Sequence, residues 1–386
     1  MTRPRIGLDV RMVDTIETGL GRYARELVSR LPALAPDCDF VLIKRPPLAG
    51  ERLGWAGNVT EAVVPGYLDH PLNLVTGGLI NRLRLDLYHS LHHFLPLGLK
   101  VPRVVVTLHD LIWVEHARLT FDTRHAWLKW RVTHLYGRAT MRHALAGADH
   151  VVAISRHSGE RAHCRYGLPS ERITVVHHGA DHFLPADADG AHLAGAAEEA
   201  AEDATAPYLF SLGNSKPYKN LRGLLHAFAL VARRHLDVRL LIAGRGDSLR
   251  NLRILADSLG ISGRVEFCGM VSDTQVHQLF RGARALVFPS FIEGFGFPLV
   301  EAMAAGCPVV TSDIPVIREI VGEAALCADP ASPAAIASAI EQVLGDAALR
   351  RQLRLAGRER ASRFTWAACA ARTAAVHRRL LEADGR

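Results

Sequence analysis

The stretch from Val287 to Ser312 constrains the fold of this chain more than any other segment. An apolar run at 285–288 is typical of a buried strand in a parallel sheet, and a loop with one acid and two glycines follows it. Pro298 stands where the first turn of a helix tolerates proline, and Gly306 stands where a helix ends. Another apolar strand begins at Pro308. This order predicts a strand, a glycine loop, a short helix and a second strand.

The start of the helix predicted at 299–305 is a candidate anion site, because backbone N–H groups point outward from such a helix end. Glu293 in the loop and Glu301 in the helix flank this position. Acids would repel a phosphate, so we expect them to accept hydrogen bonds from neutral hydroxyls. The alternative is that neither acid binds a ligand: Glu293 would be an ordinary loop residue, and Glu301 would be favoured early in the helix by the helix dipole. A Glu-x7-Glu spacing is common by chance, so the spacing alone does not exclude this. The combination favours a pocket for a sugar nucleotide.

Length and composition suggest a globular protein of about two domains, since the chain has 386 residues, 49% of them hydrophobic and 22% charged. The sequence contains no run of eighteen apolar residues, so no membrane-spanning helix is expected. The N-terminus leads into a strand, and no signal peptide is predicted. Six cysteines are scattered without the spacing of metal ligands, which favours reduced thiols and a cytoplasmic protein. The formal charge of +7 suits nucleotide diphosphates or an acidic membrane surface better than nucleic acid, because no lysine-rich tract occurs.

A second candidate anion site lies near the N-terminus. A strand at 5–10 is followed by a glycine loop containing Gly19 and Gly21, and by a helical pattern that begins at Tyr23. The glycine spacing is incomplete for a dinucleotide fingerprint, so NAD binding is disfavoured. The alternatives of a phosphate loop and of a plain turn between strand and helix have equal weight on these residues alone.

His109 follows the apolar strand at 103–108, at the strand end where ligands bind in open α/β sheets. By position alone, a histidine that donates a hydrogen bond to a backbone carbonyl is favoured over a functional one.

The helical pattern at 124–145 interleaves tryptophans with arginines, which suits a membrane surface, but a helix whose cations face water is the commoner case.

The middle of the chain changes character at 185–206, where Ala, Asp, Glu and Gly predominate, and this composition predicts a surface linker. The linker contains a literal Asp-x-Asp at Asp187 and Asp189. No strand precedes it, so we interpret it as solvated and predict no metal and no cofactor.

Beyond the linker, a strand at 208–212 leads into a turn with Lys216 and Lys219. Lysines at such a turn can neutralise a leaving diphosphate, although solvent-facing lysines are the usual case.

The strand and helix patterns on either side of the linker predict an α/β fold with two doubly wound, Rossmann-like domains that face a cleft. We expect an N-terminal domain at 1–184, the acidic linker at 185–206 and a C-terminal domain at 207–363. The last segment, 364–386, is predicted to be helical.

Several motifs resemble a known family. The run from Glu293 to Pro298 and the run from Glu301 to Gly306 resemble the donor-binding signature of retaining GT-B glycosyltransferases, a family that includes bacterial polysaccharide mannosyltransferases. The segments 18–23, 109–111 and 219–221 are also similar to those mannosyltransferases. The resemblance implies that the first domain faces the acceptor, that the second binds the nucleotide sugar, and that the C-terminal helix returns to the first domain.

The resemblance also implies roles for single residues. Catalysis would depend on His109 facing the donor sugar, Lys219 binding the diphosphate and Glu293 holding sugar hydroxyls, while Glu301 would hold the ribose. Many family members carry an arginine where this chain has Asn214, and Lys216 could supply that charge. The remaining donor-binding residues implied by the resemblance are Gly19, Gly21, Met270, Val271, Gly294, Phe295, Gly296, Phe297 and Leu299.

The activity implied is a retaining, metal-independent hexosyl transfer from a nucleotide-diphosphate sugar, with GDP-mannose as the first guess, to a glycan or lipid-linked acceptor in surface polysaccharide synthesis. The enzyme would be cytoplasmic, with a peripheral contact at the inner face of the membrane. The alternative on the same fold is a sugar-nucleotide epimerase. An NAD-dependent oxidoreductase and an inactive nucleotide-binding scaffold are further alternatives.

Overall fold

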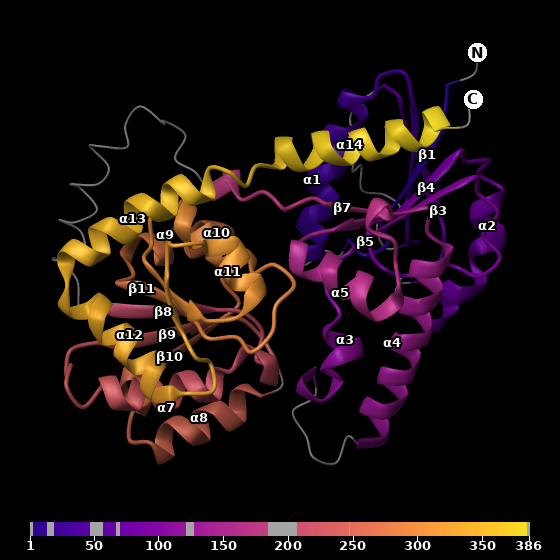
Figure 1. The fold of residues 1–386 in the computed structure, drawn as a ribbon. Helices are drawn as coiled ribbons and strands as arrows, with labels where there is room; N and C mark the ends of the chain where they lie inside the picture. The colour runs from indigo at the N-terminus through magenta and orange to yellow at the C-terminus, as the bar shows by residue number, and fades with distance from the viewer. Residues whose placement is uncertain are drawn as a thin grey trace. The chain divides into compact units, whose positions relative to one another are not determined.

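The computed structural model describes residues 3–13, 19–46, 57–66, 70–120, 127–183, 207–246 and 248–383. The chain divides into two compact units, drawn in Figure 1. The first unit comprises Met1–Glu115, Val132–Gly179 and Thr365–Arg386, and the second comprises His116–Arg131 and Ala180–Phe364. Each unit contains its own parallel sheet, so the predicted α/β fold with two doubly wound sheets is confirmed.

The sheet of the first unit has the strand order β3-β2-β1-β4-β5-β6-β7, with every neighbouring pair parallel. The order reverses between β1 and β4, which lie side by side although β2 and β3 separate them in sequence. Ligands bind beyond the carboxyl ends of the strands at such a reversal. The strands are β1 (Arg5–Asp9), β2 (Asp39–Lys44), β3 (Val59–Val63), β4 (Leu87–Ser90), β5 (Arg103–Leu108), β6 (His150–Ala153) and β7 (Ile173–Val175).

Helices cover this sheet, and the C-terminal helix α14 packs against the N-terminal helix α1 (Figure 1). Helix α1 begins at Gly19, so the prediction that the helix starts at Tyr23 after a glycine loop is wrong. The α-helices are α1 (Gly19–Leu34), α2 (Gly77–Asn81), α3 (Ile112–Glu115), α4 (Trp127–Gly147, most of it in this unit), α5 (Arg156–Tyr166) and α14 (Trp366–Glu382). The short 3-10 helices are η2 (Pro71–Val75) and η5 (Ser170–Arg172).

The sheet of the second unit has the order β10-β9-β8-β11-β12-β13 and is also parallel throughout. Its reversal lies between β8 and β11, which are neighbours in the sheet. The strands are β8 (Tyr208–Leu212), β9 (Arg239–Ala243), β10 (Val265–Gly269), β11 (Ala285–Phe288), β12 (Val309–Ser312) and β13 (Leu326–Ala328). They are largely buried, as expected of a sheet covered on both faces.

Helices α7 (Leu221–Val231) and α12 (Pro333–Gly345) pack against each other over one face of this sheet and supply much of its apolar core. The other elements of the unit, in chain order, are η3 (Ala117–Thr120), η6 (Asp181–Phe183), η8 (Pro217–Lys219), α8 (Leu249–Ser258), η9 (Ser262–Arg264), α9 (Asp273–Gly282), α10 (Phe297–Ala304), α11 (Pro315–Val321) and α13 (Ala347–Ala361).

The stretch that follows β11 has the predicted order of strand, glycine loop, short helix and strand. Helix α10 begins at Phe297, two residues before the predicted start, and Pro298 lies in its first turn as predicted. Gly296 precedes the helix with a φ of +91°, and a Cβ there would come within 2.8 Å of the Leu299 side chain. This turn therefore requires glycine, both for its backbone angle and for the close packing of Leu299.

The division of the chain differs in detail from a simple sequence of domains. Helix α14 belongs to the first unit, and His116–Arg131 belongs to the second, although the predicted first domain spans 1–184. The predicted linker at 185–206, with Asp187 and Asp189, lies outside the described residues. Among the helices of the described ranges, none has the length and apolar character needed to cross a bilayer.

Candidate functional site

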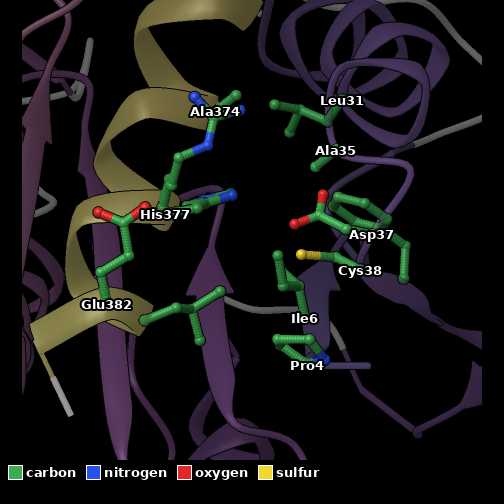
Figure 2. A pocket seen from close by; sticks show the side chains of 12 residues that line it. Pro4, Ile6, Leu31, Ala35, Asp37, Cys38, Ala374, His377 and Glu382 are labelled. Atoms are coloured by element: carbon green, nitrogen blue, oxygen red, sulfur yellow. The ribbon is translucent and has the colours of Figure 1, made fainter. Parts of the chain in front are cut away.

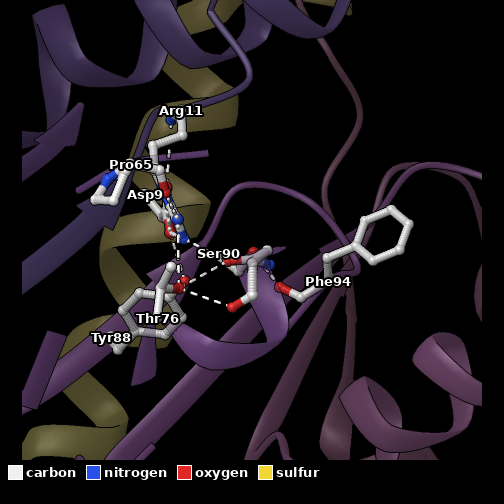
Figure 3. A network of polar contacts seen from close by, with 8 residues as sticks. Asp9, Arg11, Pro65, Thr76, Tyr88, Ser90 and Phe94 are labelled. Carbon is white, nitrogen blue, oxygen red and sulfur yellow. Dashed lines mark hydrogen bonds and ion pairs between the residues drawn. The ribbon is translucent and has the colours of Figure 1, made fainter. Parts of the chain in front are cut away.

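A buried ion pair occupies the carboxyl end of β1 in the first unit (Figure 3). Arg11 donates through Nε to Oδ1 of Asp9 at 2.9 Å and through a terminal nitrogen to Oδ2 at 2.6 Å, with both side chains fully buried. The hydroxyl of Tyr88, from the neighbouring strand β4, donates to the same Oδ2 at 2.6 Å. Burial raises the pKa of Tyr88 well above 10, so it stays protonated and keeps this donor role.

Arg11 also binds the segment around η2, where its terminal nitrogens donate to Asn73 Oδ1 at 2.7 Å and to Pro65 O at 3.3 Å. The network therefore fixes the chain that leaves β1 against two distant loops. We did not predict this network. The available signal was Asp9-x-Arg11 directly after an apolar strand, since charges in that position are either paired or functional.

His109 lies at the end of β5, and its side chain is only 4% exposed. Its Nε2 donates to the carbonyl oxygen of Leu91 at 2.9 Å. Burial lowers the pKa of His109 to about 4, although the bond to Leu91 opposes the shift. The imidazole is therefore neutral near pH 7, with its proton on Nε2 and a lone pair on Nδ1. This is the backbone-carbonyl partner favoured from position alone, and it leaves Nδ1 as the acceptor.

Three rings surround His109 in the first unit. Tyr23 meets it edge-on with ring centroids 5.1 Å apart, and His92 and His178 each stack at 5.6 Å. Burial lowers the pKa of both flanking histidines well below 6.5. The arrangement is therefore a neutral aromatic cluster. Sequence reasoning missed it, although the pair His92-His93 soon after an apolar strand was a visible signal.

A chain of hydrogen bonds runs from this cluster to the C-terminal helix. The hydroxyls of Tyr23 and Thr107 lie 2.9 Å apart, and Thr107 Oγ1 lies 3.0 Å from Nε2 of His89. Nδ1 of His89 lies 2.9 Å from Nε2 of His377 on α14. His377 also lines a cavity of about 350 Å³, which Figure 2 shows together with Cys38. This cavity lies at the amino ends of β1 and β2, away from His109 at a carboxyl strand end.

The two predicted glycines of the N-terminal region lie in the first turn of α1. Gly21 is buried, and Gly19 begins the helix. They are thus part of a helix end and not of a loop that precedes it. The preceding residues 14–18 lie outside the described part of the chain.

In the second unit, Lys219 and Glu293 form an ion pair. The Lys219 Nζ donates to Glu293 Oε1 at 2.7 Å, and the two side chains are 13% and 8% exposed. The ammonium group also lies over the rings of Phe288, at 4.7 Å, and Tyr218, at 5.4 Å. The structure thus brings together two predicted site residues that are 74 positions apart, through the neighbouring strands β8 and β11.

The remaining predicted residues around α10 differ in exposure. Glu301 lies in the second turn of the helix and is buried, at 5% exposure. Phe295 and Leu299 are also buried, and the Phe295 ring packs edge-on against Phe297 and Phe364. Such apolar side chains support the turn, so a polar ligand would meet this segment through backbone N–H groups. Gly294 and Gly296 are buried as well.

Three further predicted residues lie near other strand ends of this unit. Met270 and Val271 follow β10 after Gly269, which has a φ of +68° and turns the chain, and Met270 is 58% exposed. Lys216 lines a cavity together with Arg222, and neither Lys219 nor Glu293 lines it. Within the described ranges, no group of three or more His, Cys, Asp or Glu side chains is arranged to hold a metal ion.

Two family models match the chain. Residues 196–360 match the model described as Glycosyl transferases group 1, and residues 18–182 match that of Glycosyltransferase Family 4. Among curated proteins, the chain is 28% identical to O-antigen chain mannosyltransferase B of Escherichia coli over an alignment 376 residues long, which covers 92% of this chain and 94% of that protein.

Solved structures share the fold. Sucrose-phosphate synthase from Thermosynechococcus elongatus has a TM-score of 0.71 at 20% identity, with 99% of this chain and 100% of that chain covered. HepE from Anabaena, solved in complex with UDP-glucose, has a TM-score of 0.66 at 17% identity, covering 97% of this chain and 98% of that one.

Proposed function

Because this chain belongs to the GT-B glycosyltransferases, we propose that it transfers a hexose from a nucleotide-diphosphate sugar, with retention of configuration and without a metal ion. The observation that carries the proposal is the buried Lys219–Glu293 pair, 2.7 Å apart. Lys219 lies in η8, and Glu293 lies in the loop that precedes α10 and its buried Glu301. GDP-mannose is our first candidate donor, supported by the Escherichia coli relative that is named a mannosyltransferase.

The second unit would bind the donor. Backbone N–H groups of the turn that leads into α10 and the ammonium of Lys219 would hold the diphosphate, because both carry positive charge or partial charge. Glu301 would accept hydrogen bonds from the ribose hydroxyls, and the main chain at 270–271 would hold the base. In the first unit, the start of α1, which contains Gly19 and Gly21, is proposed to contact the phosphates.

The Lys219–Glu293 pair suggests how the charge is prepared for the reaction. Without donor, Glu293 holds the Lys219 ammonium in place by accepting its hydrogen bond and balancing its charge. When donor binds, Lys219 would turn to the diphosphate, and Glu293 would accept a hydrogen bond from a sugar hydroxyl. As the bond from the sugar anomeric carbon to the diphosphate breaks, Lys219 would stabilise the charge that develops on the leaving oxygen.

The acceptor hydroxyl would bond to the anomeric carbon on the face from which the diphosphate leaves, and its proton would pass to a phosphate oxygen. No nucleophile of the enzyme is needed for this displacement. His109 would orient the sugar, because its neutral Nδ1 can accept a hydrogen bond from a hydroxyl and its Nε2 is fixed by Leu91. A neutral imidazole also avoids a fixed positive charge at the sugar.

We further propose a glycan or lipid-linked acceptor, a role in surface polysaccharide synthesis, and a cytoplasmic location with peripheral contact at the membrane. The support is the O-antigen role in the name of the Escherichia coli relative and the formal charge of +7. A glycosyltransferase is favoured over a sugar-nucleotide epimerase, because both family models describe glycosyltransferases.

A thermal-shift screen of nucleotide sugars tests the donor, since a ligand that binds the folded state raises its stability by mass action. We expect GDP-mannose to raise the melting temperature more than UDP-glucose or a rhamnose donor, and EDTA to leave transfer unchanged. Proton NMR of the product would show an α-linkage from an α-linked donor. No shift with any nucleotide sugar would refute the function, and inversion at the anomeric carbon would refute retention.

A further inference from the structure

A cavity of about 200 Å³ lies in the second unit beside the turn that carries Lys219. Its walls come from η3, η8, the starts of α7 and α8, and the segment after β11. Apolar side chains make up much of the lining, namely those of Leu119, Leu221, Leu252 and Phe291. This cavity would suit a largely hydrocarbon group, because such a group loses its contact with water there.

Two cations border these apolar walls. Lys216 and Arg222 line the cavity, and neither side chain has a hydrogen-bond or ion-pair partner among the described residues. Within the same range, no carboxylate lines the cavity. Two other cations of this unit do have carboxylate partners, since Lys219 pairs with Glu293 and Arg234 pairs with Glu341 at 2.9 Å. Two cations without carboxylate partners beside an apolar cavity favour an anion as the ligand.

The floor of the cavity is held in place. Ser215 is 6% exposed, and its Oγ accepts a hydrogen bond from the backbone N–H of Ser248 at 3.1 Å. Its own O–H has no acceptor among the residues that the structure describes, so it can donate to a ligand. Gly246, with a φ of +153°, makes room for this hydroxyl, because a Cβ there would come within 2.0 Å of Oγ. A fixed donor that lines the same cavity as two cations is suited to a tetrahedral oxyanion.

We propose that this cavity binds a phosphate ester that carries an apolar chain, as the anchoring part of a lipid-linked acceptor. The phosphate oxygens would accept hydrogen bonds from Lys216, Arg222 and Ser215, while the chain lies against the apolar wall. The proposal deepens the proposed function and rests on it for the word acceptor. It also assigns Lys216 to the acceptor side, in place of the diphosphate role predicted from sequence.

The position of the cavity fits this role. Lys216 and Lys219 belong to one turn, and the Phe291 N–H donates to Tyr218 O at 2.8 Å in the same turn. Phe291 is two residues before Glu293. The two segments that line the cavity therefore carry the Lys219–Glu293 pair a few residues further on. The phosphate of an acceptor anchored here would contact residues that lie only a few positions in sequence from the Lys219–Glu293 pair.

Isothermal titration calorimetry with three soluble probes tests the proposal: geranyl phosphate, geraniol and inorganic phosphate. We expect geranyl phosphate to bind at least about tenfold more tightly than either other probe, since it alone combines a charged group with an apolar chain. Equal binding of inorganic phosphate would overturn the proposal by showing an anion site only. Equal binding of geraniol would overturn it by showing that the cations contribute nothing.

Variants locate the binding. Arg222→Gln and Lys216→Gln should each weaken geranyl phosphate about tenfold, and Leu119→Asp should weaken it by repulsion while leaving both cations in place. Arg233→Gln is the matched control, because this exposed arginine lies just beyond the other end of α7. Loss of geranyl phosphate binding in the control alone, or unchanged binding in both cation variants, would overturn the assignment.

Nucleotide-sugar binding by Arg222→Gln separates this proposal from the proposed function. If Arg222→Gln binds the nucleotide sugar normally and geranyl phosphate weakly, both proposals stand. If the unaltered protein binds the nucleotide sugar but not geranyl phosphate, the cavity proposal fails alone. If Lys216→Gln weakens only the nucleotide sugar, Lys216 belongs to the donor site and the cavity assignment is wrong.

Discussion

Replacing Lys219 by methionine should reduce both stability and activity, and the two effects can be separated. The ion pair with Glu293 is 2.7 Å long, with side chains 13% and 8% exposed. At an effective dielectric constant of about 20, the attraction is roughly 6 kcal/mol before desolvation is subtracted. Removing one partner of such a buried pair lowers the free energy of unfolding by about 3–5 kcal/mol, because the other charge stays buried alone. For a unit of this size, 3 kcal/mol corresponds to roughly 6–12 °C in melting temperature.

The double variant Lys219→Met/Glu293→Gln distinguishes structure from catalysis. With the carboxylate also neutralised, no buried charge is left unpaired, so most of the lost stability should return. Activity should not return, because the ammonium that stabilises the leaving diphosphate is still missing. Turnover at saturating donor should stay lower by a factor of about one hundred or more in both variants.

The assay is a pair of measurements on each variant, thermal unfolding followed by circular dichroism and turnover followed by release of the nucleoside diphosphate. Arg234→Met is the control, because Arg234 pairs with Glu341 at 2.9 Å but is 74% exposed. It should lose less than about 1 kcal/mol and no activity. Recovery of turnover together with stability in the double variant would refute the catalytic role of Lys219 and leave it a purely structural one.

Three further perturbations test other parts of the molecule. Glu301→Gln should weaken donor binding about tenfold or more by calorimetry, and unchanged affinity would remove the ribose role. Burial lowers the pKa of His109 and His377 from 6.5 to about 4, so the unfolded chain binds protons that the folded chain does not. The contribution of these two histidines to the free energy of unfolding should therefore be complete above pH 6.5 and fall as the pH drops towards 4, by up to about 1.4 kcal/mol per pH unit for each histidine. Urea unfolding of His109→Phe should show a shallower fall with pH than the unaltered protein. Arg11→Met leaves Asp9 buried without its cation and should lower the unfolding free energy by about 3–5 kcal/mol in the same assay, a loss that an exposed pair would not show.

The sequence was most informative where a local pattern decides the structure. The apolar run at 285–288, Pro298 and Gly306 predict β11 and α10, and the structure contains both with small shifts in their ends. The start of α1 was misplaced because glycine has low helix propensity. In the folded chain, Gly19 and Gly21 lie in the first turn of a helix. Later residues of this helix, such as Tyr23, pack into the core, and this packing outweighs the low helix propensity of glycine.

The candidate site could be predicted only in part, because its contacts depend on the order of strands in each sheet. Lys219 and Glu293 meet because β8 and β11 are neighbours, and local sequence does not specify that adjacency. The same reason hid the contact between Asp9 and Tyr88, which are 79 positions apart on β1 and β4. Position alone did favour the carbonyl partner of His109, since a histidine at the end of a buried strand needs one.

The membership of α14 in the first unit has a consequence for synthesis of the protein. His377 on this helix bonds to His89, 288 residues earlier in the chain, and the helix packs on α1. The ribosome makes Ala180–Phe364, nearly all of the second unit, before it makes α14. The first unit therefore cannot complete its fold until α14 has been made, and until then the face that α14 covers is open to chaperones.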